Sequence, residues 1–194
     1  MVLQGWRHIV TAPEQALPVP DFAEDGGEEP ELVGVYLIGP SGQLFRLGFV
    51  IDNEFSDHIT EKFNCLWLAH SKLRACSFGP ELLIGNLADH IEGESHIIRD
   101  GKVLWRKPFL TGEANMSHSI ANLEQDHFKY AQFGRVGDLH LHFMGTGTLS
   151  FVDDIITKLG GRLEIEAPLF VPCATASILK LMPYSLALSC CNRK

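Results

Sequence analysis

The sequence has 194 residues, of which 45% are hydrophobic, and 16 basic against 24 acidic side chains give a net charge of −8. This is enough apolar material for one domain with a sizeable core, so the composition excludes a disordered chain. An acidic chain without a block rich in Lys and Arg is repelled by a phosphate backbone, so we predict no nucleic-acid partner.

The first 28 residues are predicted to form an extended, solvated lead-in. Residues 11–30 contain four prolines and no Lys or Arg beside their acids. After them, two runs rich in β-branched and aromatic residues are joined by the turn-forming Pro40, Ser41 and Gly42. We therefore predict a β-hairpin over residues 31–52.

A second hairpin is predicted further along the chain. Asp100 and Gly101 lie between two apolar runs, and this dipeptide favours a tight turn whose central residues both have positive φ. Apolar spacings of three and four then predict a helix between Asn115 and Phe133, with Asn115 or Ser117 as its N-cap and Gly134 as its stop.

The late part of the chain returns to strands. Residues 137–151 and 162–170 alternate with period two, so the predicted fold class is mainly β (α+β), with one or two helices. Beyond them, Pro172 and Pro183 interrupt an apolar stretch that falls short of the ~18 apolar residues of a membrane span. We predict no membrane association.

The cysteine pattern and the N-terminal sequence indicate the cellular compartment of the protein. The five cysteines show no C-x-x-C spacing, and the sequence begins without a basic segment followed by a long apolar run. These features predict reduced thiols in a cytoplasmic protein.

Acidic residues at one end of the first hairpin are the best candidates for chemistry. Glu29 and Glu31 are two residues apart, so on a strand both carboxylates lie on the same face. Glu54 follows the second strand and can return to the same level, with Asp52 and Asp57 as alternatives. A hard divalent ion such as Mg²⁺ would relieve the repulsion among these acids. The alternative is a solvated strand edge.

Two further segments carry weaker signals. Lys72 is flanked by apolar and small residues, so it is either a proton donor or acceptor with a pKa lowered by burial and a nearby cation, or an ordinary surface lysine. His140 and His142 share one strand face and are either ligands of a softer metal such as Zn²⁺ or Fe²⁺, or polar core residues. The turn at Gly145 and Thr146 can present its N–H groups and hydroxyl to a carboxylate.

Four segments in this order resemble the motifs of the fumarylacetoacetate hydrolase superfamily, over residues 18–167. The segments are the Glu29-Pro30-Glu31 triplet, LGFVIDNEFSDHITE, HSKLRACSFGPELLIG and GDLHLHFMGTGT. Among its members, the sequence is most similar to 2-keto-3-deoxy sugar acid dehydratases and diketo-acid hydrolases of sugar-acid catabolism.

The resemblance implies a mixed β-sheet roll, a homodimer and one divalent ion, Mg²⁺ or another hard ion such as Mn²⁺ or Ca²⁺. The metal ligands would be Glu29, Glu31 and Glu54, and Lys72 would be the active-site lysine. The pair Gly145 and Thr146 would receive the carboxylate of the substrate.

The resemblance also implies a function and a division of the chain. The expected function is that of a metal-dependent enzyme acting on a small 2-keto acid, preferably as a dehydratase. The alternatives are a C–C hydrolase of 2,4-diketo acids and a catalytically silent metal-binding fragment. Residues 29–172 would form the catalytic domain and residues 173–194 a divergent, poorly packed apolar tail. Hydrolases of the family carry a His and Glu pair on a lid upstream of the Glu pair, and because 28 residues precede Glu29 in this sequence, we expect that lid segment to be missing.

Overall fold

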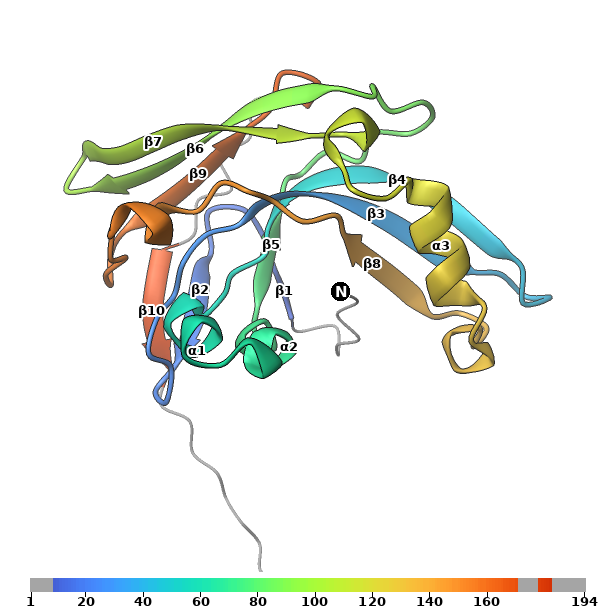
Figure 1. The fold of residues 1–194 in the computed structure, drawn as a ribbon, viewed down its shortest axis with the longest axis horizontal. Helices are drawn as coiled ribbons and strands as arrows, with labels where there is room; N and C mark the ends of the chain where they lie inside the picture. Colours follow the sequence, from blue (N-terminus) through green and yellow to red (C-terminus); the bar gives the residue numbers. More distant parts are fainter. Residues whose placement is uncertain (1–8, 171–177, 183–194) are drawn as a thin grey trace, which may run out of the picture.

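The computed structural model describes residues 9–170 and 178–182, which form three β-sheets and short helices (Figure 1). The five-stranded sheet has the order β1-β5-β4-β3-β8 and the three-stranded sheet the order β7-β6-β9, while β2 pairs in parallel with β10. The strands are β1 (Val10–Thr11), β2 (Ala16–Pro20), β3 (Pro30–Ile38), β4 (Leu44–Asn53), β5 (Cys76–Phe78), β6 (Ile91–Arg99), β7 (Lys102–Thr111), β8 (Leu139–Phe143), β9 (Arg162–Glu166) and β10 (Ile178–Met182). The mainly β (α+β) fold class is confirmed.

The main core lies between the two larger sheets, which face each other in Figure 1. Leu32 and Phe49 of the five-stranded sheet contribute to it, together with Phe109 and Ile165 of the three-stranded sheet. All four side chains are buried, and fully burying a side chain of this size stabilises the fold by about 1.5–3 kcal/mol. This packing fixes the strands whose ends carry the acidic residues.

Both predicted hairpins are confirmed. Strands β3 and β4 pair antiparallel from Pro30 opposite Asn53 to Ile38 opposite Leu44, and β6 and β7 pair in the same way. Between β6 and β7, Asp100 has φ of 50° and Gly101 has φ of 72°, as the turn requires.

The predicted helix is present but begins later and ends earlier than expected: Gly134 is not its stop, because it follows a separate 3₁₀ turn over Ala131–Phe133. Helix α3 spans Ile120–Phe128, and its N-cap is Ser119, whose hydroxyl accepts a hydrogen bond from the Asn122 N–H. The prediction of Asn115 or Ser117 as N-cap is wrong, because residues Glu113–Asn115 form a separate 3₁₀ turn, η2. The Glu113 carboxylate then accepts a hydrogen bond from the Ile120 N–H at 2.8 Å, which adds a second cap.

The described part of the chain contains three α-helices, rather than one or two. Besides α3, these are α1 (His58–Phe63) and α2 (Leu68–Ser71), with the 3₁₀ turn η1 (Cys65–Trp67) between them. Two further 3₁₀ turns are η3 (Ala131–Phe133) and η4 (Ser150–Asp153). Helices of four to six residues are too short for apolar periodicity to reveal. None of the described helices is long and apolar enough to cross a membrane.

Both ends of the chain contribute strands. Within the predicted lead-in, Leu17 of β2 is fully buried beside Ile97 and Leu163, so the expectation of a wholly solvated segment is wrong. In the predicted tail, residues 178–182 form β10, whereas residues 173–177 and 183–194 lie outside the described residues. The division of the chain at residues 29 and 172 stays a prediction.

Candidate metal and substrate site

The hairpin of β3 and β4 brings three acidic residues together. Glu31 pairs with Asp52 across the hairpin, and the Glu54 N–H donates to the Glu29 carbonyl at 3.0 Å, which extends the pairing past the strand ends. One carboxylate oxygen from each of Glu29, Glu31 and Glu54 lies within 4.8 Å of the others, and all three residues are buried. The three residues that the sequence suggested as metal ligands therefore lie close together in the structure.

Lys72 lies against this cluster from the C-terminal end of α2. Its side chain is buried, and its Nζ contacts the carboxylate of Glu29, lies 3.0 Å from Oε2 of Glu54 and donates to the hydroxyl of Ser56 at 3.2 Å. The possibility of a solvent-pointing surface lysine is therefore wrong. The ammonium faces the carboxylates of Glu29 and Glu54, two of the three candidate metal ligands.

The electrostatics of the cluster differ from one acid to the next. Burial raises the pKa of Glu29, but His58 and Lys72 outweigh it and lower this pKa to about 2. Burial, together with the charges of Glu54 and Glu29, raises the pKa of Glu31 well above its usual value. The pKa of Glu54 is also raised, chiefly by burial. The carboxyls of Glu31 and Glu54 therefore resist ionisation, and a cation among the three acids would favour their charged forms.

The pKa of Lys72 moves in the opposite direction from the sequence-based expectation. Burial lowers it, but the charges of Glu29 and Glu54 outweigh burial and raise it above its usual value. Without a competing cation, Lys72 is thus held as an ammonium. A divalent ion on the same carboxylates would oppose this charge and lower the pKa.

His58 is a site residue that the sequence analysis missed. It is buried at the start of α1, with Nε2 3.2 Å from Oε1 of Glu29 and Nδ1 3.7 Å from Oδ2 of Asp25. Although burial lowers its pKa, these two carboxylates raise it to about 9. His58 is therefore a cation at neutral pH that fixes the orientation of Glu29.

The two alternative acids differ in their surroundings. Asp57 is occupied elsewhere, because it caps α1 through the Thr60 N–H and pairs with Arg74 at 2.7 Å. Asp52 is fully buried, and burial raises its pKa well above the usual value. Its Oδ2 has no hydrogen-bond partner among the described residues.

The residues present fit a hard divalent ion. Three oxygens no farther than 4.8 Å apart share a point within about 2.8 Å of each, compared with ~2.0–2.6 Å for Mg²⁺ or Ca²⁺ bonds to oxygen. In the described part of the chain, Oε1 of Glu54 is buried and has no hydrogen-bond partner. An oxygen-only donor set is what Mg²⁺, Mn²⁺ and Ca²⁺ prefer.

The loop after β8 joins the cluster to a polar cavity. The Gly145 N–H donates to Oε2 of Glu31 at 2.6 Å, and Gly145 has φ of 85°, which glycine adopts without strain. A cavity of about 300 Å³ lies beside this loop, lined by Thr111, Asn115, Ser117, Gly145 and Thr146 among others. Gly145 thus connects the acids to a space large enough for a small organic acid.

Glu28 anchors the far end of the same loop and was also missed by the sequence analysis. It is fully buried, and it accepts hydrogen bonds from the N–H of Ser150 at 2.8 Å and from its hydroxyl at 2.7 Å. Burial raises its pKa despite these bonds. Because Glu28 precedes Glu29 directly, the contact holds the loop against the acidic cluster.

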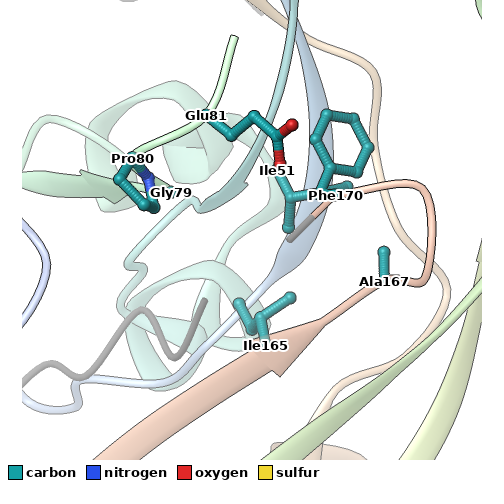
Figure 2. Close-up of a pocket in the computed structure, with 7 residues that line it drawn as sticks. All are labelled: Ile51, Gly79, Pro80, Glu81, Ile165, Ala167 and Phe170. Carbon is teal, nitrogen blue, oxygen red and sulfur yellow. The ribbon is translucent and has the colours of Figure 1, made fainter. Parts of the chain in front are cut away.

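A second, apolar pocket does not suit a substrate. It is lined by Ile51, Ile165, Ala167 and Phe170 with the Gly79–Glu81 segment (Figure 2). Its volume is about 10 Å³, roughly the room of one water molecule. None of the predicted site residues lines it.

Comparison with known proteins gives matches in structure only. No protein-family model and no curated protein matches the sequence. A solved 2-keto-3-deoxy-D-arabinonate dehydratase, complexed with magnesium and 2,5-dioxopentanoate, is similar with a TM-score of 0.73 and 21% identity, over 91% of this chain and 60% of that one.

An isomerase is a further structural neighbour. The 5-carboxymethyl-2-hydroxymuconate delta-isomerase of Mycobacterium smegmatis has a TM-score of 0.60 and 17% identity, over 91% of this chain and 67% of that one. The chain thus spans about 60% of the length of the dehydratase and about two thirds of the isomerase. This chain therefore has the fold of these enzymes, which is the fold that its resemblance to the fumarylacetoacetate hydrolase superfamily predicts.

Proposed function

We propose that this protein is a divalent-metal-dependent enzyme that removes water from a small 2-keto-3-deoxy sugar acid. The convergence of Glu29, Glu31 and Glu54, buried and in contact with Lys72, is the observation that supports this function most strongly. The magnesium in the similar dehydratase structure supports Mg²⁺ as the ion, with Mn²⁺ and Ca²⁺ as substitutes.

Each residue of the site has a defined task in this proposal. Glu29, Glu31 and Glu54 hold the ion, which when bound polarises the 2-keto group of the substrate. Thr146 offers the substrate's carboxylate its backbone N–H and its hydroxyl from the wall of the adjacent cavity, and Gly145, whose own N–H is bound to Glu31, forms the turn that presents them. His58 keeps Glu29 ionised and correctly oriented.

Lys72 moves the proton. Loss of water breaks the C3–H and C4–O bonds of the substrate and forms a double bond between C3 and C4, so one proton leaves C3 and one reaches the departing hydroxyl. A single amine can accept the first and return it as the second, which balances the reaction. Lys72 is the described amine that lies against the carboxylate cluster. General acid–base catalysis of this kind contributes about 10²–10⁴-fold.

Two alternatives share this site. A C–C hydrolase of 2,4-diketo acids would use the same ion and the same lysine. A catalytically silent metal-binding protein would hold the same ion in the carboxylate cluster without turning over a substrate. Turnover separates the three possibilities.

We also propose a cytoplasmic homodimer. Helices α1 and α2 and the turn between them expose several large apolar side chains, namely Ile59, Phe63, Leu66, Trp67 and Leu68, which a second copy of the chain would cover. The two described cysteines, Cys65 and Cys76, are free thiols, which supports a reducing compartment. Sedimentation velocity of the purified chain tests the dimer, and a concentration-independent monomer contradicts it.

The test of the function is a substrate screen with and without Mg²⁺. We expect turnover of 2-keto-3-deoxy acids that requires Mg²⁺, is lost in Glu31→Gln and is retained in Glu92→Gln, whose carboxylate is exposed on β6. Preferential cleavage of 2,4-diketo acids would replace the dehydratase by the hydrolase. Mg²⁺ binding without turnover of any of these acids would support the silent fragment.

A further inference from the structure

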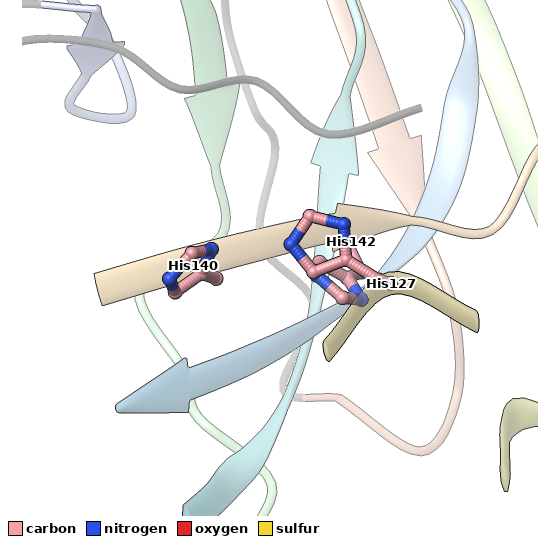
Figure 3. Close-up of side chains that lie close together, drawn as sticks. All are labelled: His127, His140 and His142. Atoms are coloured by element: carbon pink, nitrogen blue, oxygen red, sulfur yellow. The ribbon is translucent and has the colours of Figure 1, made fainter. Parts of the chain in front are cut away.

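Three histidines converge on the side of the five-stranded sheet that carries α3. His127 comes from the last turn of α3, and His140 and His142 from β8 (Figure 3). One ring nitrogen of each lies within 4.8 Å of the others. We propose that these imidazoles form a second metal site, for a first-row transition metal such as Zn²⁺, distinct from the carboxylate cluster.

The fold brings the three residues together from two elements. His140 pairs with Tyr36 and His142 with Gly34 on the neighbouring strand β3, so both imidazoles leave the same face of the sheet. Helix α3 packs on this face through Ile120, and its last turn places His127 beside both rings, with centroids 5.4 Å from His140 and 4.6 Å from His142. The third ligand therefore comes from a separate element.

Burial leaves these rings short of hydrogen bonds. His140 is 2% exposed and His142 5% exposed. Nε2 of His127, Nε2 of His142 and both ring nitrogens of His140 have no hydrogen-bond partner of normal geometry among residues 9–170. A buried polar group without a partner costs about 1–3 kcal/mol. A metal ion bound by three of these nitrogens would remove most of that cost.

The donor chemistry selects the class of metal. Three imidazoles with no carboxylate suit Zn²⁺, Cu²⁺, Ni²⁺ or Co²⁺ and do not suit Mg²⁺ or Ca²⁺, which take oxygen ligands. The three nitrogens share a point within about 2.8 Å of each, so side-chain shifts of under 1 Å reach the ~2.1 Å of a Zn–N bond. Water would complete a tetrahedral site.

The surroundings support neutral, oriented imidazoles. Burial lowers the pKa of His142 to about 3 and also lowers the pKa values of His127 and His140. The three imidazoles are therefore neutral at pH 7. The backbone carbonyl of Phe133 lies near enough to His140 to favour its protonated form. With an ion on one ring nitrogen of His140, the other would donate to this carbonyl, which is the usual support of a metal-bound histidine.

An aromatic cluster is the alternative explanation. His127 stacks on Phe133 with centroids 4.0 Å apart, and His142 stacks on Phe128 at 5.1 Å. Stacking explains why flat rings gather here, but phenylalanine would stack equally well. It does not explain the convergence of three nitrogens, so replacement of histidine by phenylalanine distinguishes a metal site from a packed aromatic core.

The two candidate metal sites lie on opposite faces of the sheet. His142 pairs with Gly34, which is three residues after Glu31 on β3, and an odd spacing along a strand places the side chains on opposite sides. An ion at the histidines would therefore fasten α3 to β8, the strand that leads to Gly145, without touching the substrate. We assign the site a structural role.

The experiment measures Zn²⁺ binding to the chelator-treated full chain carrying Glu31→Gln, which disables the carboxylate cluster. By calorimetry, we expect one equivalent of Zn²⁺ and a melting temperature that rises with added Zn²⁺. Adding His127→Phe should weaken binding by about 100-fold or more and abolish the rise, because one of three ligands is lost. His118→Phe, at an exposed histidine before α3, is the matched control and should bind as before.

A Co²⁺ absorption spectrum tests the site without the histidine variants, which could fail to fold. Co²⁺ added to the Glu31→Gln chain should give the strong visible absorption of a four- or five-coordinate nitrogen site. The weak absorption of six-coordinate Co²⁺ would overturn the proposal. So would a folded Glu31→Gln chain that binds no Zn²⁺, or Zn²⁺ binding that survives both His127→Phe and His142→Phe.

Discussion

Replacing Lys72 by methionine should affect catalysis and stability in ways that reveal its place in the site. The substitution keeps an unbranched apolar side chain of nearly the same length but removes the ammonium that contacts Glu29 and Glu54. Breaking a buried ion pair by removing one partner costs about 3–5 kcal/mol. Because His58 still pairs with Glu29, we expect the lower end, about 3 kcal/mol, in the absence of Mg²⁺ at pH 7.

The loss should depend on the conditions. Added Mg²⁺ should restore stability, because it supplies the positive charge that the carboxylates have lost, and a concentration of 100 times Kd contributes about 2.7 kcal/mol. Turnover should fall by about 10²-fold or more while Mg²⁺ binds at least as tightly as in the wild type, since the ammonium no longer competes for the same carboxylates.

Denaturant unfolding with and without Mg²⁺, together with steady-state kinetics, measures these effects. Lys102→Met, at an exposed lysine at the start of β7, is the matched control and should leave all three quantities unchanged. Wild-type turnover in Lys72→Met would refute the role of Lys72 in proton transfer. Mg²⁺ binding weakened tenfold or more would show instead that Lys72 supports the ion.

Two further predictions concern the residues around the cluster. The pKa of His58 is raised from 6.5 to about 9, so its contribution, of the order of 3 kcal/mol and shared with Glu29, should be fully present below pH 6.5 and lost as the pH rises through 9. Chemical unfolding from pH 6 to 10 measures it, and His58→Gln should flatten the curve. Glu28→Ala should lower the unfolding free energy by about 2 kcal/mol or more, because it leaves the buried Ser150 N–H and hydroxyl without a hydrogen-bond acceptor. An unchanged denaturation midpoint in Glu28→Ala would contradict the anchoring of the Gly145 loop.

The parts of the fold that the sequence predicted are those set by local chemistry. Asp100 and Gly101 specify their turn whatever surrounds them, so the second hairpin was predictable. The start of α3 was not, because the choice between Ser117 and Ser119 depends on the η2 turn and on the carboxylate of Glu113. Several serines can cap a helix, and the preceding backbone decides among them.

The candidate site divides in the same way. Because side chains alternate along a strand, the sequence predicted Glu29 and Glu31 on one face, and the predicted hairpin brought Glu54 beside them. The contact of His58 with Glu29 requires the path of α1, and the meeting of His127 with His140 requires the packing of a helix on a sheet. The raised pKa of Lys72 follows from its distances to two carboxylates, which sequence alone does not supply.

The location of a bound ion tests the central claim most directly. Crystals of the protein soaked in Mn²⁺ should give one anomalous difference peak among Glu29, Glu31 and Glu54, with oxygen ligands at about 2.2 Å, and Glu31→Gln crystals should lose that peak. A map in which Mn²⁺ lies elsewhere, while these carboxylates remain paired with Lys72 and His58, would contradict a metal-dependent site.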